Sequence, residues 1–183
     1  GNVAIFDMQQ EKGAALAAEL GDQVIFCLTD VTQEESVNDG IAKAKEQFGA
    51  LHGLINAAGC GWTERTISKK GAHSFPVFEQ IIRLDLLGTF NVASKAAQVM
   101  SENAPNDTGE RGVIVNVASV AAFDGQIGQV AYAASKGAVV SMTLPMARDL
   151  AFSGIRVMTV APGMFRTPLL AMLPPEALNA LNA

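Results

Sequence analysis

The sequence predicts an α/β fold in which one parallel sheet is doubly wound, with helices packed on both of its faces. Short stretches rich in Val and Ile alternate with helical stretches of ten or more residues, which is typical of βαβ units. The 183 residues fit a single domain with a substantial core, and they contain no internal repeat, low-complexity tract or interdomain linker. We therefore expect one three-layer αβα domain over residues 1–183.

The elements are placed in order by these patterns. Val-Ala-Ile-Phe opens the chain as a strand and leads into an Ala-rich helix, and each later β-branched or apolar run is followed by a longer helical segment. Two polar stretches, residues 61–74 and 101–112, interrupt the alternation and are expected to be surface loops. Strands are expected at residues 3–6, 24–28, 54–56, 113–117 and 156–161, and helices at residues 10–20, 34–48, 78–100 and 130–152.

The composition argues against several kinds of partner. Apolar residues make up 49% of the chain and charged residues 17%, and the net charge is −5. This balance offers no basic footprint for direct nucleic-acid binding and no polybasic membrane patch, and no apolar run approaches the ~18 residues of a transmembrane helix. Cys27 and Cys60 have the spacing of neither a zinc site nor a disulfide framework, so we expect two free thiols and no metal site.

Three residues around the fourth predicted strand point to catalysis. Ser119 follows the strand at residues 113–117, at the carboxyl end, where open α/β sheets carry their chemistry. Tyr132, the only tyrosine, and Lys136 lie four residues apart, so a helix would place both on one face. An ammonium there is expected to lower the phenol pKa from about 10 towards neutrality. Chance pairing on a solvated helix is the alternative, and Ser119 argues against it.

In this order and spacing, Ser119, Tyr132 and Lys136 resemble the short-chain dehydrogenase/reductase family. The resemblance implies a Rossmann-like sheet and an NAD-dependent oxidoreductase that interconverts a secondary alcohol and a ketone. It implies that Tyr132 acts as general acid/base on the substrate oxygen, that Ser119 hydrogen-bonds this oxygen, and that Lys136 also binds the nicotinamide ribose. Hydride transfer belongs to the cofactor.

Further segments match the cofactor-binding pattern of this family. Asp7 closes the first strand, where a carboxylate accepts hydrogen bonds from the adenosine ribose and repels a 2′-phosphate, which favours NAD over NADP. A helix N-cap or a solvated strand end would explain Asp7 equally well on its own. The resemblance assigns the other NAD contacts to Asp30, Val31, Asn56, Ala57, Gly59, Tyr132, Lys136, Pro162, Gly163, Phe165 and Thr167.

The resemblance narrows to a subgroup that acts on 3-hydroxyacyl-CoA and hydroxysteroid substrates, on the basis of residues 112–129, 143–150 and 161–170. It implies a largely apolar substrate pocket, a mitochondrial location and a homotetramer. Pocket candidates are Gln126, Gln129, Phe165 and Leu169. Small and apolar residues on more than one face of two long helices also favour oligomerisation: Ala93, Ala96, Ala97, Ala133, Ala134, Ala138, Val139 and Met142.

Some family features are absent from the 183 residues. The Gly-rich loop that binds the cofactor pyrophosphate and the strand before it are not found, nor are the last strand and tail of the family. We therefore expect a chain shortened at both ends, in which the strands at residues 3–6 and 54–56 flank an empty slot or pair directly. Loss of two or three charge-assisted hydrogen bonds to pyrophosphate costs on the order of 3–9 kcal/mol, so we expect weak NAD binding by these residues alone.

An acid stands where the family usually has a catalytic asparagine. Residues 82–90 match that segment, and Asp85 takes the asparagine position. A carboxylate there is expected to disfavour the phenolate of Tyr132 and to compete for Lys136. The alternative is that Asp85 still holds a relay water, with slower turnover.

The remaining polar residues are expected to have no catalytic role. Ser135 and Ser141 are assigned to a helix surface or an interface, because neither follows a strand. Two other functions stay open: a catalytically silent scaffold, since the subgroup also serves in a mitochondrial tRNA-processing complex, and an inactive fragment. Residues assigned to the surface or to a lid are His52, Trp62, Lys69, Lys70 and His73.

Overall fold

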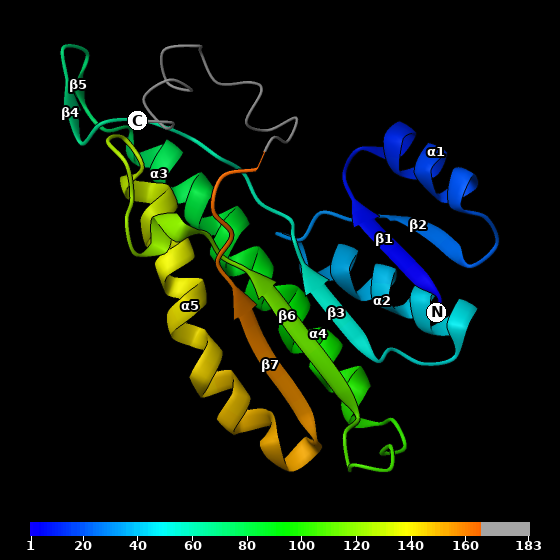
Figure 1. Cartoon of the computed structure of the whole chain (residues 1–183). Coiled ribbons are helices and arrows are strands. Elements are labelled where there is room, and N and C mark those ends of the chain that lie inside the picture. The colour runs from blue at the N-terminus through cyan, green and yellow to red at the C-terminus, as the bar shows by residue number, and fades with distance from the viewer. Residues whose placement is uncertain (166–183) are drawn as a thin grey trace.

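Strands and helices alternate through residues 1–165, the part of the chain that this computed structural model describes (Figure 1). All expected strands and helices are present, with boundaries shifted by a few residues. The elements are β1 Val3–Asp7, α1 Gln10–Leu20, β2 Val24–Leu28, α2 Glu34–Phe48, β3 Gly53–Asn56, β4 Ile67–Ser68, β5 Gly71–Ala72, α3 Phe75–Ile82, the π-helix η1 Arg83–Gly88, α4 Thr89–Ser101, β6 Gly112–Val117, the 3₁₀ turn η2 Val120–Ala122, α5 Val130–Leu150, the 3₁₀ turn η3 Ala151–Ser153 and β7 Ile155–Val160.

The main strands form two separate parallel sheets. One consists of β1 and β2, and the other has the order β3-β6-β7. Within the described residues β1 pairs only with β2, and β3 only with β6, so of the two expected outcomes the structure has the slot between β1 and β3. The prediction of parallel pairing is confirmed, and the sheet is divided at this slot because no described strand lies between β1 and β3.

Helices lie on both faces of the β1–β2 sheet. A Cβ on Gly13 of α1 would overlap the Phe26 ring, and one on Gly40 of α2 would touch the Phe6 ring. Phe6 pairs with Cys27, the neighbour of Phe26, so the two rings point to opposite faces of the sheet. This part of the chain is therefore doubly wound, as predicted.

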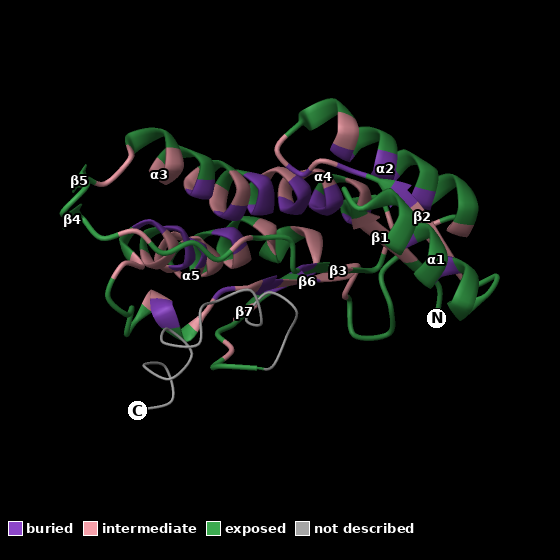
Figure 2. Ribbon diagram, turned by 90° about the horizontal axis from the view of Figure 1, so that it is seen from above, coloured by how far each residue is buried: buried purple, intermediate pink, exposed green. Residues whose placement is uncertain are grey.

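The β3-β6-β7 sheet buries one face against α4 and α5 (Figure 2). Ile114 and Val157, paired across β6 and β7, belong to the core that this face shares with α2 and α4. The opposite face carries Ile55, which is 72% exposed, and Met158, which is 46% exposed. Within residues 1–165, helices cover this sheet on one side only.

The β3–β6 register is marked by a buried polar pair. Asn56 lies opposite Asn116, and its Nδ2 donates to the Asn116 Oδ1 at 2.9 Å. The same Nδ2 lies 3.2 Å from the backbone carbonyl of Thr89 in α4. The pair therefore joins both strands and the helix above them at the carboxyl ends of the strands.

Several small residues expected at an oligomer interface are buried within the chain itself. Ala93, Ala96 and Ala97 face the sheet from α4, and Val139 is buried on α5. Their small side chains let α4 approach the sheet closely. They belong to the core of one chain. The expectation that these positions are available for an oligomer interface is therefore wrong.

The long helix expected at residues 78–100 is interrupted. It begins earlier, at Phe75, with Pro76 in its first turn, and its middle is the π-helical segment η1. A π turn adds a residue to the helical repeat and is frequent at functional sites. It places Asp85 on the buried side, where its exposed fraction is 0%.

The loop expected at residues 61–74 contains a short hairpin. Here β4 and β5 pair antiparallel, with Ile67 opposite Ala72. Gly71, at φ 114°, adopts a backbone conformation in the turn that side chains disfavour. The hairpin projects at one end of the molecule, away from the β3-β6-β7 sheet (Figure 1).

Replacing Ile114 by Ala should lower the free energy of unfolding by about 2–5 kcal/mol, because its side chain is fully buried in β6. Ile127→Ala is the matched control, since Ile127 is 78% exposed and its truncation should change stability by less than about 0.5 kcal/mol. Urea unfolding of both variants measures the difference. Equal losses would contradict the described core.

Candidate active site

Ser119, Tyr132 and Lys136 come together at the carboxyl end of β6, as the sequence predicts. Ser119 follows the strand; its Oγ accepts the Ala121 N–H at 3.2 Å, and its hydroxyl lowers the pKa of the Tyr132 phenol. Lys136 lies one turn after Tyr132 on α5, with its Nζ 5.7 Å from the centre of the Tyr132 ring. The Nζ donates to the Val117 carbonyl at 3.1 Å, which ties α5 to the end of β6.

Asp85 lies beneath this group and contacts two elements. Its Oδ1 accepts a hydrogen bond from the Cys60 backbone N–H at 2.9 Å, in the loop after β3. Its Oδ2 lies 3.2 Å from the Ser135 Oγ and 4.0 Å from the Lys136 Nζ, both on α5. One buried carboxyl therefore links the β3 loop to the helix that carries Tyr132.

Burial dominates the electrostatics of the site. It raises the pKa of Tyr132, the Asp85 charge raises it further, and the hydrogen bond from Ser119 lowers it by less. The prediction that Lys136 brings this pKa towards neutrality is therefore wrong for the site without a cofactor. The prediction that Asp85 disfavours the phenolate is confirmed.

The neighbouring groups show the same effect of burial. Burial lowers the pKa of Lys136, against the raising effect of Asp85, and raises the pKa of Asp85, against the lowering effect of Lys136. Burial and the Asp85 charge also raise the pKa of the Cys60 thiol to about 11. Cys60 is therefore a neutral thiol near pH 7 and not a nucleophile.

Gly59 provides the space in which this group packs. A Cβ at this position would lie 3.1 Å from the Asp85 Oδ1 and 3.3 Å from the Lys136 Nζ. Both are tight contacts, and the two atoms are part of a buried pair. The absence of a side chain at Gly59 therefore has a steric reason within the protein itself.

The residues expected at the adenosine end lie at the carboxyl ends of β1 and β2. Asp7 is exposed, and its Oδ1 accepts the Gln9 N–H at 2.8 Å, so it stabilises the turn before α1 and is not the helix N-cap. The Asp30 Oδ1 accepts from both the N–H and the hydroxyl of Thr32. Val31 is buried against Gly88 of η1.

The turn after β3 mixes buried and exposed positions. The Asn56 Nδ2 donates to the Asn116 Oδ1 and to the Thr89 carbonyl, so this side chain stabilises the sheet and its contact with α4. Ala57 and Gly59 are exposed beside it. A cofactor contact by this turn would therefore be made by the two small residues and the backbone.

The segment expected at the nicotinamide follows β7. The Pro162 carbonyl accepts the Val120 N–H at 3.0 Å, which places this segment beside the turn that begins at Ser119. Gly163 and Phe165 are exposed. Thr167 and Leu169 lie outside the described residues.

The two glutamines expected in the substrate pocket bond to each other. The Gln129 Oε1 accepts the Gln126 N–H at 2.8 Å, directly before α5. Gln126 is exposed and Gln129 half-buried. In this structure Gln129 shapes the loop, and Gln126 is the one whose side chain is open to a ligand.

Of the residues assigned to the surface, Ser135 is buried and His73 is half-buried. Ser135 is fully buried against Asp85, because the first turns of α5 face η1. The His73 side chain is 10% exposed, with Nδ1 bonded to the Ser74 carbonyl and an edge-on contact to Phe78. The spacing of Ser135, directly before Lys136 and three residues after Tyr132, was a usable signal. The remaining surface assignments agree with the structure: His52, Trp62, Lys69, Lys70 and Ser141 are exposed.

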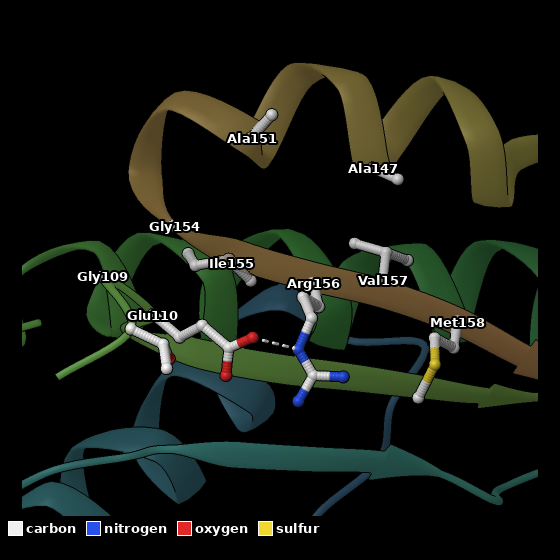
Figure 3. Close-up of a pocket in the computed structure, with 10 residues that line it drawn as sticks. Gly109, Glu110, Ala147, Ala151, Gly154, Ile155, Arg156, Val157 and Met158 are labelled. Carbon is white, nitrogen blue, oxygen red and sulfur yellow. Dashed lines mark ion pairs between the residues drawn. The ribbon is translucent and has the colours of Figure 1, made fainter. Parts of the chain in front are cut away.

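A cavity of about 460 Å³ lies away from these residues, between α5 and the free edge of β7 (Figure 3). Ala147, Ile155 and Val157 line it, and an ion pair of 2.7 Å between Arg156 and Glu110 borders it. Ala147 is 15 residues beyond Tyr132 on the same helix, which is about 22 Å. The cavity is therefore not part of the candidate active site.

Other kinds of site are not found among residues 1–165. No group of three or more His, Cys, Asp and Glu side chains has an arrangement that would hold a metal ion there. No helix of this part is long and apolar enough to span a membrane. Both cysteines are free, as expected.

A parallel α/β domain with a serine, a tyrosine and a lysine at the carboxyl end of one strand defines a dehydrogenase of the Rossmann type. The family model described as short chain dehydrogenase matches residues 1–177, and the chain belongs to the short-chain dehydrogenase/reductase family. The resemblance found in the sequence is thereby confirmed, and the chain is an oxidoreductase by family.

Three of the proteins similar to this chain share one name. The 3-hydroxyacyl-CoA dehydrogenase type-2 of Drosophila melanogaster is 51% identical over 94% of this chain and 69% of its own length. The human protein of that name is 47% identical over 98% and 70%. A crystal structure of 3-hydroxyacyl-CoA dehydrogenase type-2 from Mycobacterium avium has a TM-score of 0.89 and 42% identity, covering 93% of this chain and 68% of that chain.

Gly59→Ala should displace Asp85 and Lys136 and destabilise the protein by about 1–3 kcal/mol, because its Cβ meets a packed pair. Gly53→Ala, in the strand that precedes this turn, is the control, since its Cβ would meet only a Val113 methyl group at 3.9 Å. Thermal unfolding of both variants compares them. If Gly59→Ala is as stable as Gly53→Ala, the described packing is wrong.

Proposed function

We propose that the protein interconverts 3-hydroxyacyl-CoA and 3-ketoacyl-CoA with NAD, and that hydroxysteroids are further substrates of the same site. The grouping of Ser119 with Tyr132 at the end of β6, with Lys136 one turn away, is the observation on which this proposal rests. The identity of up to 51% with proteins named 3-hydroxyacyl-CoA dehydrogenase type-2 supports the substrate class. Residues at two strand ends, Asp7 and Pro162, support a dinucleotide that extends across them.

The residues of the chain divide the work on the substrate oxygen. Ser119 holds the oxygen by a hydrogen bond, and Tyr132 removes its proton during oxidation or returns it during reduction. NAD, when bound, accepts or supplies the hydride. Because the pKa of Tyr132 is raised, its protonated form prevails at neutral pH, and oxidation should become faster as the pH rises.

Asp7 supports the choice of NAD over NADP. Its carboxylate is exposed at the carboxyl end of β1, and only Oδ1 has a hydrogen-bond partner in the turn to α1. The second oxygen is left to accept a ribose hydroxyl. A 2′-phosphate in the same place would meet a like charge.

Location and assembly are part of the same proposal. We propose a mitochondrial location and a homotetramer, as the resemblance of the sequence implies. The exposed side of α4 and α5 offers the surface for a two-fold interface, with Phe90 on α4 and Leu144 on α5 both more than half exposed.

A catalytically silent scaffold is the second candidate, and Asp85 favours it. An ionised Asp85 would add to the effect of burial in raising the pKa of Tyr132, and would so oppose the base form that oxidation requires. Measured turnover decides between the two, since a scaffold would bind partners without converting substrate.

Tyr132→Phe should reduce turnover with 3-hydroxyacyl-CoA by about 10²–10⁴-fold, because the proton acceptor is lost. One hydroxyl is removed, so the thermal midpoint should stay close to that of the wild-type protein. Ser141→Ala, which removes an exposed hydroxyl from the same helix, should keep full activity. Near-normal kcat in Tyr132→Phe would rule out this residue as the acid/base.

The kcat/KM with NAD should exceed that with NADP by tenfold or more, which corresponds to about 1.4 kcal/mol of preference. Asp7→Ala should narrow this ratio, because it removes both the ribose acceptor and the repulsion of the 2′-phosphate. Asp22→Ala, at an exposed turn, should leave the ratio unchanged. A higher kcat/KM with NADP in the wild-type protein would contradict the role of Asp7.

A further inference from the structure

The hydroxyl of Ser135 has one hydrogen and two acceptors within reach. Its Oγ lies 2.8 Å from the Tyr132 carbonyl and 3.2 Å from the Asp85 Oδ2. A helical serine commonly donates to the carbonyl three or four residues before it, and the shorter distance assigns the hydrogen there. The contact between Oγ and Oδ2 then joins two oxygens and needs a hydrogen from Asp85.

The other strong donors around Asp85 do not supply this hydrogen. The Cys60 N–H donates to Oδ1, and the Cys60 thiol, a weak donor, also hydrogen-bonds to the same carboxyl. The Lys136 Nζ stands 4.0 Å from Oδ2, beyond hydrogen-bond distance, and donates instead to the Val117 carbonyl. The Asp85 side chain has no exposed surface, so water does not reach Oδ2 from bulk solvent.

We propose that Asp85 carries a proton on Oδ2 at neutral pH and that this neutral carboxyl, through Ser135, positions the first turns of α5. Hydrogen bonds then run from Asp85 to the Ser135 Oγ and on to the Tyr132 carbonyl, and Oδ1 still accepts the Cys60 N–H. All of these contacts have a hydrogen in place. Burial raises the pKa of Asp85 and outweighs the lowering effects of Lys136 and of hydrogen bonds to the carboxyl from Cys60 and Ser135.

The charged and titratable groups around Asp85 determine what its ionisation would change in the site. Lys136 and Tyr132 face Asp85 from α5, Cys60 faces it from the loop after β3, and Arg83 on η1 is exposed to solvent. An ionised Asp85 would lose its link to Ser135 and would stand beside the phenol of Tyr132. The effect on turnover rests on the proposed function, whereas the protonation state does not.

The stability of the fold should depend on pH through this group. In the unfolded chain Asp85 ionises in its ordinary acidic range, whereas in the folded chain it keeps its proton. Between the two pKa values the native state binds one more proton than the unfolded state, so stability falls as the pH rises. Asp85 and Ser135 are thus positioning residues, and their role can be measured without turnover.

Carbon-13 NMR of protein labelled at the aspartate carboxyl carbons tests the protonation state. The resonance missing from Asp85→Asn is that of Asp85. At neutral pH we expect it at the chemical shift of a protonated carboxyl. Titration of the Asp85 resonance in the ordinary acidic range would overturn the proposal, and because no substrate is involved, that failure is distinct from failure of the proposed function.

Two pairs of variants test the link to Ser135. Ser135→Ala removes the acceptor of the proton, so the Asp85 resonance should titrate at lower pH, while Ser141→Ala on the exposed side of α5 should not shift it. An amide at position 85 donates to Ser135 and accepts from Cys60, so Asp85→Asn should keep the thermal midpoint and reduce its fall with rising pH. Asp85→Ala should lower the midpoint. An Asp85→Asn midpoint as low as that of Asp85→Ala would show that the carboxylate is required and would overturn the proposal.

Discussion

Desolvation at the junction of β6, η1 and α5 is the constraint on which the chemistry of this protein depends. Asp85 has no exposed surface and Lys136 only 5%, so two ionisable groups share a space from which water is nearly excluded. Burial shifts the pKa of each towards its neutral form, and it raises that of Tyr132 beside them. The groups that hold the site together are therefore also those that set its proton affinity.

Much of the fold could be predicted because period and composition are local properties of the sequence. The bounds of α1, β2 and α2 agree with the prediction residue by residue, because the apolar residues within each segment are enough to identify the element. The break in the helix at η1 and the division of the sheet could not be predicted in this way. Both depend on contacts between distant segments: the π turn faces α5, and the slot lies between β1 and β3, which are separated along the chain by α1, β2 and α2.

The part of the site that forms a sequence motif could be predicted, whereas the part that depends on how the elements pack together could not. Ser119, Tyr132 and Lys136 have a recognisable spacing, and the structure brings them together. Ser135 was assigned to a surface because it does not follow a strand, although its spacing to Tyr132 and Lys136 indicates the face of α5 that meets η1. The direction of the Tyr132 pKa was wrong for a related reason, since charge can be read from the sequence while burial follows only from the assembled elements.

The amide pair of Asn56 and Asn116 has a consequence for how the strands find their alignment. A slip of one residue between β3 and β6 would turn every side chain of the moved strand to the other face. It would separate the two amides and expose a buried polar group to apolar neighbours, at a cost of about 1–3 kcal/mol. The hydrogen bond between the two amides therefore favours a single register of β3 on β6. In that register the turn at Gly59 and the hydroxyl of Ser119 lie side by side at the carboxyl ends of the two strands.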